Sequence, residues 1–280
     1  MNQAKTLKQE QVDVTDRACK RFKLIASNIK ISKLKYLHQS LNFKSNIFFH
    51  ENEGKEYKYQ KYKRGSVVMV NFGTNVGYEL SGNHFAIVLN PDDNNKNGLV
   101  TVIPLTSKEK KQYLELNESI LDLVLNAQNE YLEMLSNTQK DFALHNDEMH
   151  NALEAAKFNL KKINKLMGED RYIEKYNDEL NRLFEESQKY MELVEELREI
   201  TDKESKEIEE NMEKIYAVLD NYNKKNKTSY AMVRNITTIS KLKILKPINK
   251  FDPIGRIYVS NESLDKIDSE IKKIFTFSKS

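Results

Sequence analysis

The chain contains little cysteine, glycine and proline, and each scarcity excludes a class of protein. Cys19 is the single cysteine among 280 residues, so neither an intramolecular disulfide nor a cysteine-based zinc cluster can form. Only eight glycines and four prolines are present, which favours long uninterrupted helices over a turn-rich all-β fold. The length suffices for one or two domains, each with its own core.

Long hydrophobic runs are absent as well. No apolar stretch approaches the roughly 18 residues that a membrane-spanning helix needs, and the N-terminus carries no signal-type hydrophobic region. The sequence therefore predicts a soluble, cytoplasmic protein with no membrane partner.

Two common kinds of catalytic site are also missing. The five histidines are scattered without a surrounding carboxylate cluster, and no glycine-rich loop of the nucleotide-binding type occurs. His145 and His150 are five positions apart, whereas a spacing of four positions places two metal ligands on one helix face. We expect no metal site and no other cofactor.

Charge, in contrast, is plentiful and unevenly distributed. Residues 109–227 contain 18 basic and 28 acidic side chains, a balance of −10, and the remainder contains 27 basic and 14 acidic ones, a balance of +13. A basic body suits a polyanion such as RNA or DNA. The alternative is that many small cytosolic domains are basic without binding nucleic acid.

Four segments differ in pattern. Residues 1–60 are polar, basic and largely helical in pattern, and we expect them to form an N-terminal helical extension. Residues 61–108 contain short β-branched runs separated by glycines, which predicts an antiparallel sheet with tight turns. Residues 228–280 return to alternating strand patterns and close with a helix over 261–275, capped by Ser260 or Asn261.

The segment 109–227 is helical in pattern throughout. It has no proline, and its one glycine, Gly168, lies at its midpoint. Apolar residues recur at alternating spacings of three and four, as in a coiled coil. In the second half the exceptions along this seam are Ser187, Thr201, Glu204 and Asn211.

This pattern predicts an antiparallel helical hairpin inserted into one β domain. The rival is a bundle of four shorter helices, with breaks near "SNTQKD" and "TDKESKE". A hairpin returns the chain close to the point where it left, so residues 228–280 are expected to complete the sheet that residues 61–108 begin.

Two stretches point to a known family. The stretch "KRGSVVMVNFGTNVGYELSGNHFAIVLN", followed by "LVTVIPLTS", resembles the N-terminal half of MazF/PemK-type toxins, the small ribonucleases of bacterial toxin–antitoxin systems. "SYAMVRNITTISKLKI" is similar to a later strand of the family and "NESLDKIDSEIKKIF" to its C-terminal helix. The resemblance covers residues 61–108 and 228–275, about a third of the chain.

The resemblance implies an α+β fold with a small SH3-like or CcdB-like antiparallel β-barrel. It also implies metal-independent cleavage of single-stranded RNA, such as mRNA, and hence growth arrest or phage defence. An antitoxin protein and a homodimer are the implied partners. The family's motif residues fall here on Glu79, His84, Thr106 and Ser107, and His84 stands where the family carries an arginine.

Attack by a ribose 2′-hydroxyl needs a base, a donor for the departing 5′-oxygen, and stabilisation of the phosphorane. Histidine titrates near neutrality and so suits proton transfer, whereas arginine provides charge and is a poor proton donor. His84 is therefore compatible with catalysis as proton carrier or as cation. Thr106 and Ser107 are expected to bond the scissile phosphate, and Glu79 to orient His84 or contact RNA.

Each of these residues also has a structural interpretation. A lone histidine at a strand start is usually structural, strand-end hydroxyls often bond their own turn, and Glu79 alternatively caps the turn. A basic rim of RNA-binding residues is expected at Arg64, Lys241 and Lys243. The alternative function is a barrel that has lost cleavage and binds RNA or protein, with the acidic coiled coil serving in oligomerisation or in regulation over the RNA groove.

Overall fold

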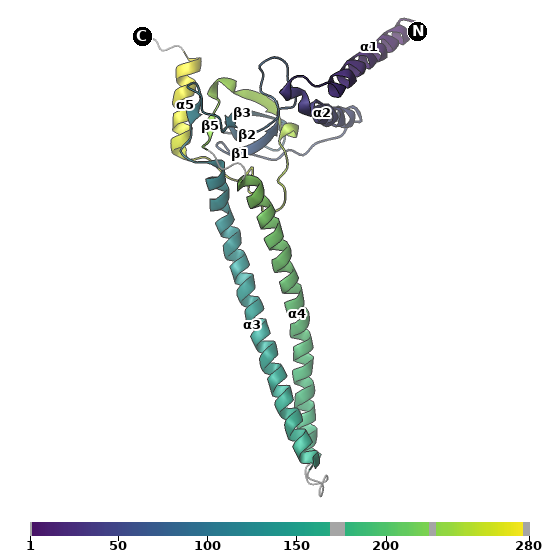
Figure 1. Cartoon of the computed structure of the whole chain (residues 1–280), viewed down its shortest axis with the longest axis vertical. Helices are drawn as coiled ribbons and strands as arrows, with labels where there is room; N and C mark the ends of the chain where they lie inside the picture. The colour runs from purple at the N-terminus through teal and green to yellow at the C-terminus, as the bar shows by residue number, and fades with distance from the viewer. Residues whose placement is uncertain (1, 169–176, 224–227, 277–280) are drawn as a thin grey trace. The chain divides into compact units, whose positions relative to one another are not determined.

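The computed structural model describes residues 2–168, 177–223 and 228–276 (Figure 1). It contains helices and an antiparallel sheet, so the prediction of an α+β fold is confirmed. The described residues form two compact units. One holds the sheet, the N-terminal helices and the C-terminal helix, and the other holds residues 125–224 and 249–252.

The sheet has six strands, and every pairing among them is antiparallel. The strands follow the order β1-β2-β3-β5-β4, and β6 pairs with β3 beside β5. Their bounds are β1 (Val67–Asn71), β2 (Asn83–Val88), β3 (Leu99–Thr106), β4 (Leu114–Glu115), β5 (Tyr230–Ala231) and β6 (Thr237–Ser240).

β-Branched residues build the core of this sheet. Val68, Val70, Val88 and Val102 are fully buried and pack in one apolar cluster, which Ile239 of β6 joins. Valine and isoleucine fit the pleated surface of a strand because their branched side chains pack well against cross-strand neighbours. The core thus unites segments that lie on opposite sides of the long helical segment in the sequence.

Strand pairing joins the two ends of the chain in the same way. β6 pairs with β3 through Val100↔Ile239 and Val102↔Thr237, and β5 pairs with the end of β3 through Thr106↔Tyr230. The chain therefore leaves the sheet after β4 and returns to it at β5.

Continuous strand pairing does not close this sheet. The 3₁₀ turn η4 (Lys241–Lys243) follows β6 and interrupts its extended backbone. Beyond the turn, the chain regains the sheet only through isolated bridges, Val70↔Ile244 and Ser66↔Tyr258. The SH3-like or CcdB-like barrel is therefore not confirmed, because the turn breaks the ladder that would join β6 to β1.

Helices come before the first strand and after the last strand in the sequence. The N-terminal segment forms α1 (Asn2–Ser27), η1 (Ser32–Tyr36) and α2 (Leu37–Asn52). The last helix, α5 (Asn261–Phe275), begins after Ser260, whose hydroxyl accepts a hydrogen bond from the Ser263 amide at 3.1 Å. Serine was one of the two predicted caps, and it stabilises the helix by satisfying an otherwise unpaired amide.

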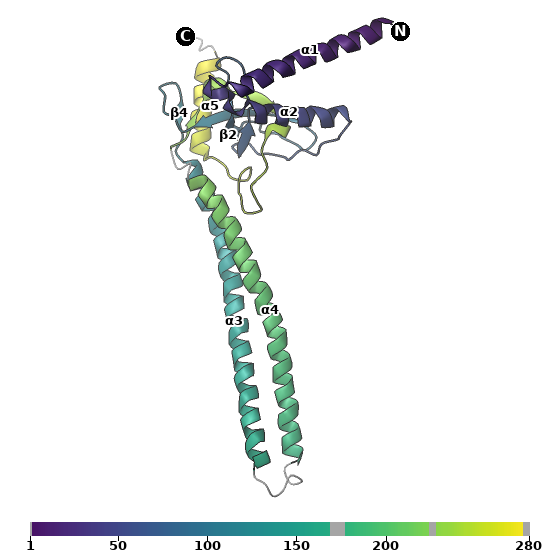
Figure 2. The same ribbon diagram turned by 45° about the vertical axis from the view of Figure 1, so that its right-hand side comes forward.

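The helical segment forms two long helices, α3 (Ile120–Gly168) and α4 (Asn177–Asn223) (Figure 2). Both run without interruption through "SNTQKD" and "TDKESKE", so the bundle of four shorter helices is wrong. Ile163 packs with Leu183 near the far ends, and Leu135 packs with Ile215 nearer the other ends, which makes the pair antiparallel. None of the described helices combines the length and apolar character needed to cross a membrane.

The polar exceptions of the predicted seam are buried with their apolar neighbours. Ser187, Thr201 and Asn211 are each 7% exposed or less. The hydroxyl of Ser187 donates to the carbonyl of Leu183 at 2.7 Å, and that of Thr201 donates to Arg198 at 3.0 Å. Hydroxyls that return to their own helix backbone occupy a seam without leaving an unpaired polar group.

Glu204, the fourth exception, faces a histidine across the seam. Both of its carboxylate oxygens lie 3.0 Å from Nδ1 of His145. Hydrogen bonding to Glu204 raises the pKa of His145, and the charges of Glu204, Glu148 and Asp141 act in the same direction against the opposing effect of desolvation. The pair therefore binds a proton more tightly in the folded hairpin than in the unfolded chain.

This pair predicts a pH-dependent hairpin. The stabilisation is complete at a pH below the unfolded histidine value, near 6.5, and is lost as the pH rises through the raised folded value. Thermal melting followed by circular dichroism should show wild type losing stability from about pH 6 to pH 8, and Glu204→Gln losing much less. His150→Ala, an exposed histidine of the same helix, is the control and should follow wild type. Equal slopes for Glu204→Gln and wild type would contradict the role of the pair.

Candidate functional site

His84 lies near the start of β2, where the chain enters the sheet from the loop 72–82. The loop closes through hydrogen bonds between Gly82 and its partners Phe72 and Gly73, at 2.9 and 2.7 Å. Gly82 has φ +93°, a conformation that an L side chain rarely adopts. The sequence thus places a glycine where the loop must turn sharply before His84.

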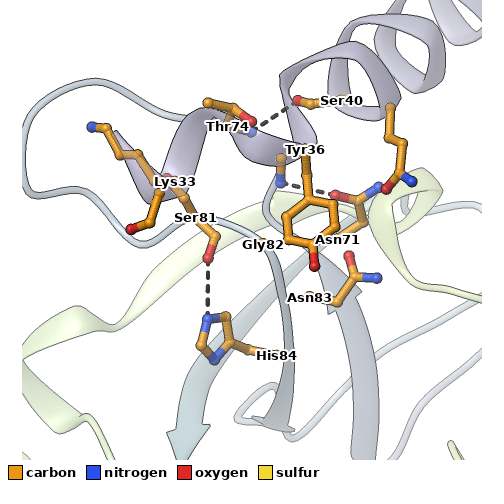
Figure 3. A pocket seen from close by; sticks show the side chains of 12 residues that line it. Lys33, Tyr36, Ser40, Asn71, Thr74, Ser81, Gly82, Asn83 and His84 are labelled. Atoms are coloured by element: carbon orange, nitrogen blue, oxygen red, sulfur yellow. Dashed lines mark hydrogen bonds between the residues drawn. The ribbon is translucent and has the colours of Figure 1, made fainter. Parts of the chain in front are cut away.

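The ring of His84 is half-buried and held between two backbone carbonyls. Nδ1 lies 3.3 Å from the carbonyl oxygen of Leu105, and Nε2 lies 3.2 Å from that of Ser81 (Figure 3). The ring also meets Phe72 edge to face, with centroids 6.2 Å apart. His84 therefore joins the loop before β2 to the end of β3.

This arrangement sets how many hydrogen bonds the ring can donate to its carbonyl partners. A carbonyl oxygen only accepts hydrogen bonds, and a neutral imidazole carries a single N–H, so it donates to one of the two carbonyls. The imidazolium form donates to both. Both nitrogens thus face acceptors of the protein, and a substrate that contacts either nitrogen must first replace a carbonyl partner.

Thr106 comes to the same place from β3. The pairing of β2 with β3 ends at Ala86 and Pro104, and the ring of His84 meets the carbonyl of Leu105, the residue directly before Thr106. The Thr106 hydroxyl accepts from the Lys108 amide at 3.2 Å, which leaves its proton available to another acceptor. Ser107 follows it and is exposed. The contact of His84 with the Leu105 carbonyl thus places the ring beside the strand end that carries Thr106 and Ser107.

Glu79 is placed differently. It lies exposed in the loop 72–82, and its carboxylate makes no hydrogen bond or ion pair with the residues that the structure describes. Its backbone carbonyl accepts from the Ser81 hydroxyl at 3.3 Å. The groups that orient His84 are carbonyls of Ser81 and Leu105, and the Glu79 carboxylate is free to meet solvent or a ligand.

Two of the three predicted RNA-binding cations are committed to the fold. The Lys241 amine is buried and donates to Asp93 at 2.7 Å and to the carbonyls of Gln60 and Asn94 at 3.0 and 2.9 Å. Its three N–H groups are thus all used inside the protein, and this geometry does not fit an RNA contact.

Arg64 is held in a similar way, whereas the Lys243 amine forms no hydrogen bond or ion pair with the described residues. The guanidinium of Arg64 donates to the Leu89 carbonyl at 2.8 Å and forms an ion pair with Asp268 of α5. Lys243 is half-buried on η4. Two of the three cations that the sequence predicts to contact RNA are thus bound within the protein.

A pocket of about 600 Å³ opens beside His84. One wall comes from the loop 72–82 and its flanking strand residues. The other comes from η1 and the start of α2, which contribute Ser32, Lys33, Tyr36, Gln39 and Ser40. Sequence reasoning missed this second wall, because residues 1–60 lie outside the motifs that carry the resemblance.

Two contacts fasten the wall from η1 and α2 to the loop. The Lys33 amine donates to the carbonyls of Asn75 and Gly77 at 3.0 and 2.6 Å. The Ser40 hydroxyl accepts from the Thr74 amide at 2.8 Å. Among all the described residues, no three histidine, cysteine, aspartate or glutamate side chains are grouped as a metal site requires.

A comparison with known families finds a match over part of the chain. Residues 63–129 match the model of the PemK-like, MazF-like toxins of type II toxin–antitoxin systems, which confirms the resemblance. The matched segment contains Glu79, His84, Thr106 and Ser107, and the wall contributed by residues 32–40 lies outside it. No curated protein matches the chain.

Proposed function

We propose, from this kinship with PemK-like and MazF-like toxins, that the protein is an endoribonuclease that cleaves single-stranded RNA without a metal. The observation that carries the proposal is the contact of the His84 ring with the carbonyl of Leu105, directly before Thr106, within the segment that matches the toxin family. Cleavage of mRNA in the cytoplasm would arrest growth or serve in phage defence.

The reaction balances as an internal transfer. The ribose 2′-oxygen forms a bond to the neighbouring phosphorus as the bond from phosphorus to the 5′-oxygen breaks. The 2′-hydroxyl loses its proton to a base, and the 5′-oxygen gains one from an acid. The products are a 2′,3′-cyclic phosphate and a 5′-hydroxyl, and no metal or redox partner takes part.

The described side chains fit parts of this reaction. The Thr106 hydroxyl, with its proton unused, donates to a phosphate oxygen. A cationic His84 stabilises the negative phosphorane and gives a proton to the 5′-oxygen after it exchanges one carbonyl partner for the substrate. Ser107 adds a second hydroxyl at the exposed strand end, and Glu79, unpaired on the loop, serves as proton acceptor or RNA contact.

Kinship with type II toxins also supports an antitoxin partner and a homodimer. We further propose that the bridges Val70↔Ile244 and Ser66↔Tyr258 mark an SH3-like or CcdB-like barrel whose closing strands are short. The division into an N-terminal extension (1–60), a split toxin domain (61–108 with 228–280) and a hairpin insertion (109–227) is part of the same proposal, with the acidic hairpin acting in oligomerisation or regulation.

One observation favours a second function. Both ring nitrogens of His84 already face backbone carbonyls, as expected of a structural histidine that stabilises a loop. The second candidate is therefore a barrel that binds RNA or protein without cleaving it.

Cleavage of RNA by variants separates these functions. His84→Ala and Thr106→Ala should each lower the cleavage rate at least about 100-fold, the size of effect expected on loss of one proton-transfer or charge-stabilising group. His84→Arg, which restores the charge of the related toxins, should retain part of the activity. The measurement is cleavage of end-labelled single-stranded RNA in chelator, with analysis of cyclic phosphate ends.

His38→Ala and Thr138→Ala, two residues outside the site, are the matched controls and should cleave like wild type. Intact RNA that is bound by the wild-type protein and never cut would establish the second function in place of the first.

A further inference from the structure

The pocket beside His84 is shared between the toxin-like segment and the N-terminal helices. Tyr36 of η1 and Gln39 of α2 line it. Asn71 of β1 and Asn83 of β2 line it as well, and Figure 3 shows Tyr36, Asn71 and Asn83 together. The hydrogen bonds of Lys33 and Ser40 to the loop 72–82 fix the two walls relative to each other. The pocket is therefore a built feature of this unit.

The polar groups that line the pocket are mostly uncharged. The amine of Lys33 is already bound to two carbonyls, so it contributes little free charge. Asn71 uses its oxygen to accept from the Gly73 amide at 2.9 Å, which leaves its NH₂ group to donate elsewhere. Gln39 and Asn83 are exposed, and their amides form no hydrogen bond with the described residues. The lining thus offers donors and acceptors without a strong field for an anion.

An aromatic face lies among these amides. Tyr36 is 53% exposed, which is high for a large side chain beside a cavity, and Figure 3 draws its ring among the pocket residues. Aromatic rings bind unstacked bases through their faces, and neighbouring amides bind base edges through paired donors and acceptors. The pocket volume of about 600 Å³ lies within the range of pockets that bind small organic ligands. The pocket is therefore large enough to hold one base.

We infer that this pocket binds one unpaired nucleobase of the RNA next to the cleaved phosphate. Tyr36 stacks on the base, and Gln39, Asn71 and Asn83 bond its edge. The inference deepens the proposed function, on which it rests, because it assigns base preference to a pocket that the N-terminal helices share with the toxin-like segment. His84 at the pocket's inner edge connects the bound base to the site of cleavage.

Binding and cleavage are tested with the full chain and two probes. The first probe is a fluorescent single-stranded DNA oligonucleotide, which has no 2′-hydroxyl and cannot be cut, and its affinity is measured by anisotropy. The second is an RNA pool with a randomised segment, in which sequencing of the cut ends gives the base preference.

Stacking is tested at Tyr36. Tyr36→Ala should weaken oligonucleotide binding about 10- to 100-fold, the loss expected from one stacked base, whereas Tyr36→Phe should stay close to wild type. Phe48→Ala removes another exposed aromatic side chain, 64% exposed on α2 and outside the pocket, and is the matched control. Because Tyr36 and Phe48 are both exposed, neither change should unfold the protein, and circular dichroism checks this.

Edge recognition is tested with the double variant Gln39→Ala, Asn83→Ala. It should broaden the base preference in the sequenced ends more than it lowers the overall cleavage rate. An unchanged preference in this variant together with unchanged binding by Tyr36→Ala would overturn the pocket and leave RNA cleavage standing.

The remaining outcomes separate the two proposals. Oligonucleotide binding that depends on Tyr36, in a wild-type protein that cuts no RNA, would support the pocket and overturn the nuclease. A wild-type protein that does not bind the oligonucleotide would overturn the pocket, even if a protein segment were later found in it.

Discussion

Lys241→Met is expected to destabilise the sheet-containing unit by about 3–5 kcal/mol, the usual cost of removing one partner of a buried ion pair. The side chains of Lys241 and Asp93 are 2% and 0% exposed. Loss of the amine leaves the Asp93 carboxylate buried with backbone donors alone, among them the Tyr62 amide at 2.8 Å and the Asn94 amide. It also removes hydrogen bonds to the carbonyls of Gln60 and Asn94.

The protonation of Asp93 adds a pH dependence to this prediction. Burial alone raises the pKa of Asp93, but hydrogen bonds from Lys241 and Tyr62 outweigh it and hold the pKa below its ordinary value. A lowered pKa in the folded state gives stability above the unfolded value, near 4, and this stability disappears as the pH falls. Wild type should therefore lose stability on acidification, and Lys241→Met should lose less.

Urea unfolding followed by hydrogen exchange of peptides from β1–β3 measures these changes. Lys243→Met, which removes a neighbouring half-buried amine with no such partner, should change stability by less than about 0.5 kcal/mol. The double variant Lys241→Met, Asp93→Leu should recover much of the loss, because two apolar side chains replace the pair without an isolated charge. A single variant as stable as wild type would show that water reaches and satisfies Asp93.

Phe251→Ala is expected to destabilise the helical hairpin by about 3–5 kcal/mol, the usual cost of deleting a buried phenyl ring. Phe251 is 1% exposed and packs against Leu135 of α3 and Ile215 of α4. Its ring meets Tyr131 edge to face with centroids 5.1 Å apart, and its carbonyl accepts from the Gln128 side chain at 2.7 Å. The short segment 249–252, which follows β6 in the sequence, thus forms part of the hairpin core.

A second contact anchors the same segment. The Tyr222 hydroxyl donates to Asp252 at 2.9 Å, and burial together with the Asp252 charge raises the pKa of Tyr222. Urea or thermal unfolding followed by circular dichroism at the helical band reports the hairpin. Phe184→Ala, 49% exposed on α4, is the control and should cost far less. If the two variants melt alike, the segment 249–252 contributes nothing to the hairpin.

The strands and the candidate site depend on the sequence to different degrees. Alternating β-branched runs predicted the strands, and the family motifs pointed to His84 and Thr106, but the contact of the His84 ring with the carbonyl of Leu105, directly before Thr106, is set by the fold. The missed residues, Tyr36 and Gln39, lie in a short 3₁₀ turn and at a helix start, where no periodicity or motif marks a side chain as part of a pocket.

Lys241 shows the opposite limit. A lysine after an alternating strand reads as a surface cation, because lysine is almost never fully buried without a partner. Its partner Asp93 lies 148 residues earlier in the chain, and only the pairing of β6 with β3 brings the two segments together. Sequence spacing carries no information about such a pair.

By itself the sequence determined the α+β class, the two long helices and the seam between them. These follow from local periodicity and from the near absence of glycine and proline in the helical segment. Only the tertiary structure decided that both nitrogens of His84 face carbonyls, that Lys241 is buried, and that the N-terminal helices wall the pocket. Those features depend on contacts between residues far apart in the chain, whose geometry is fixed when strands pair and side chains compete for the same buried space.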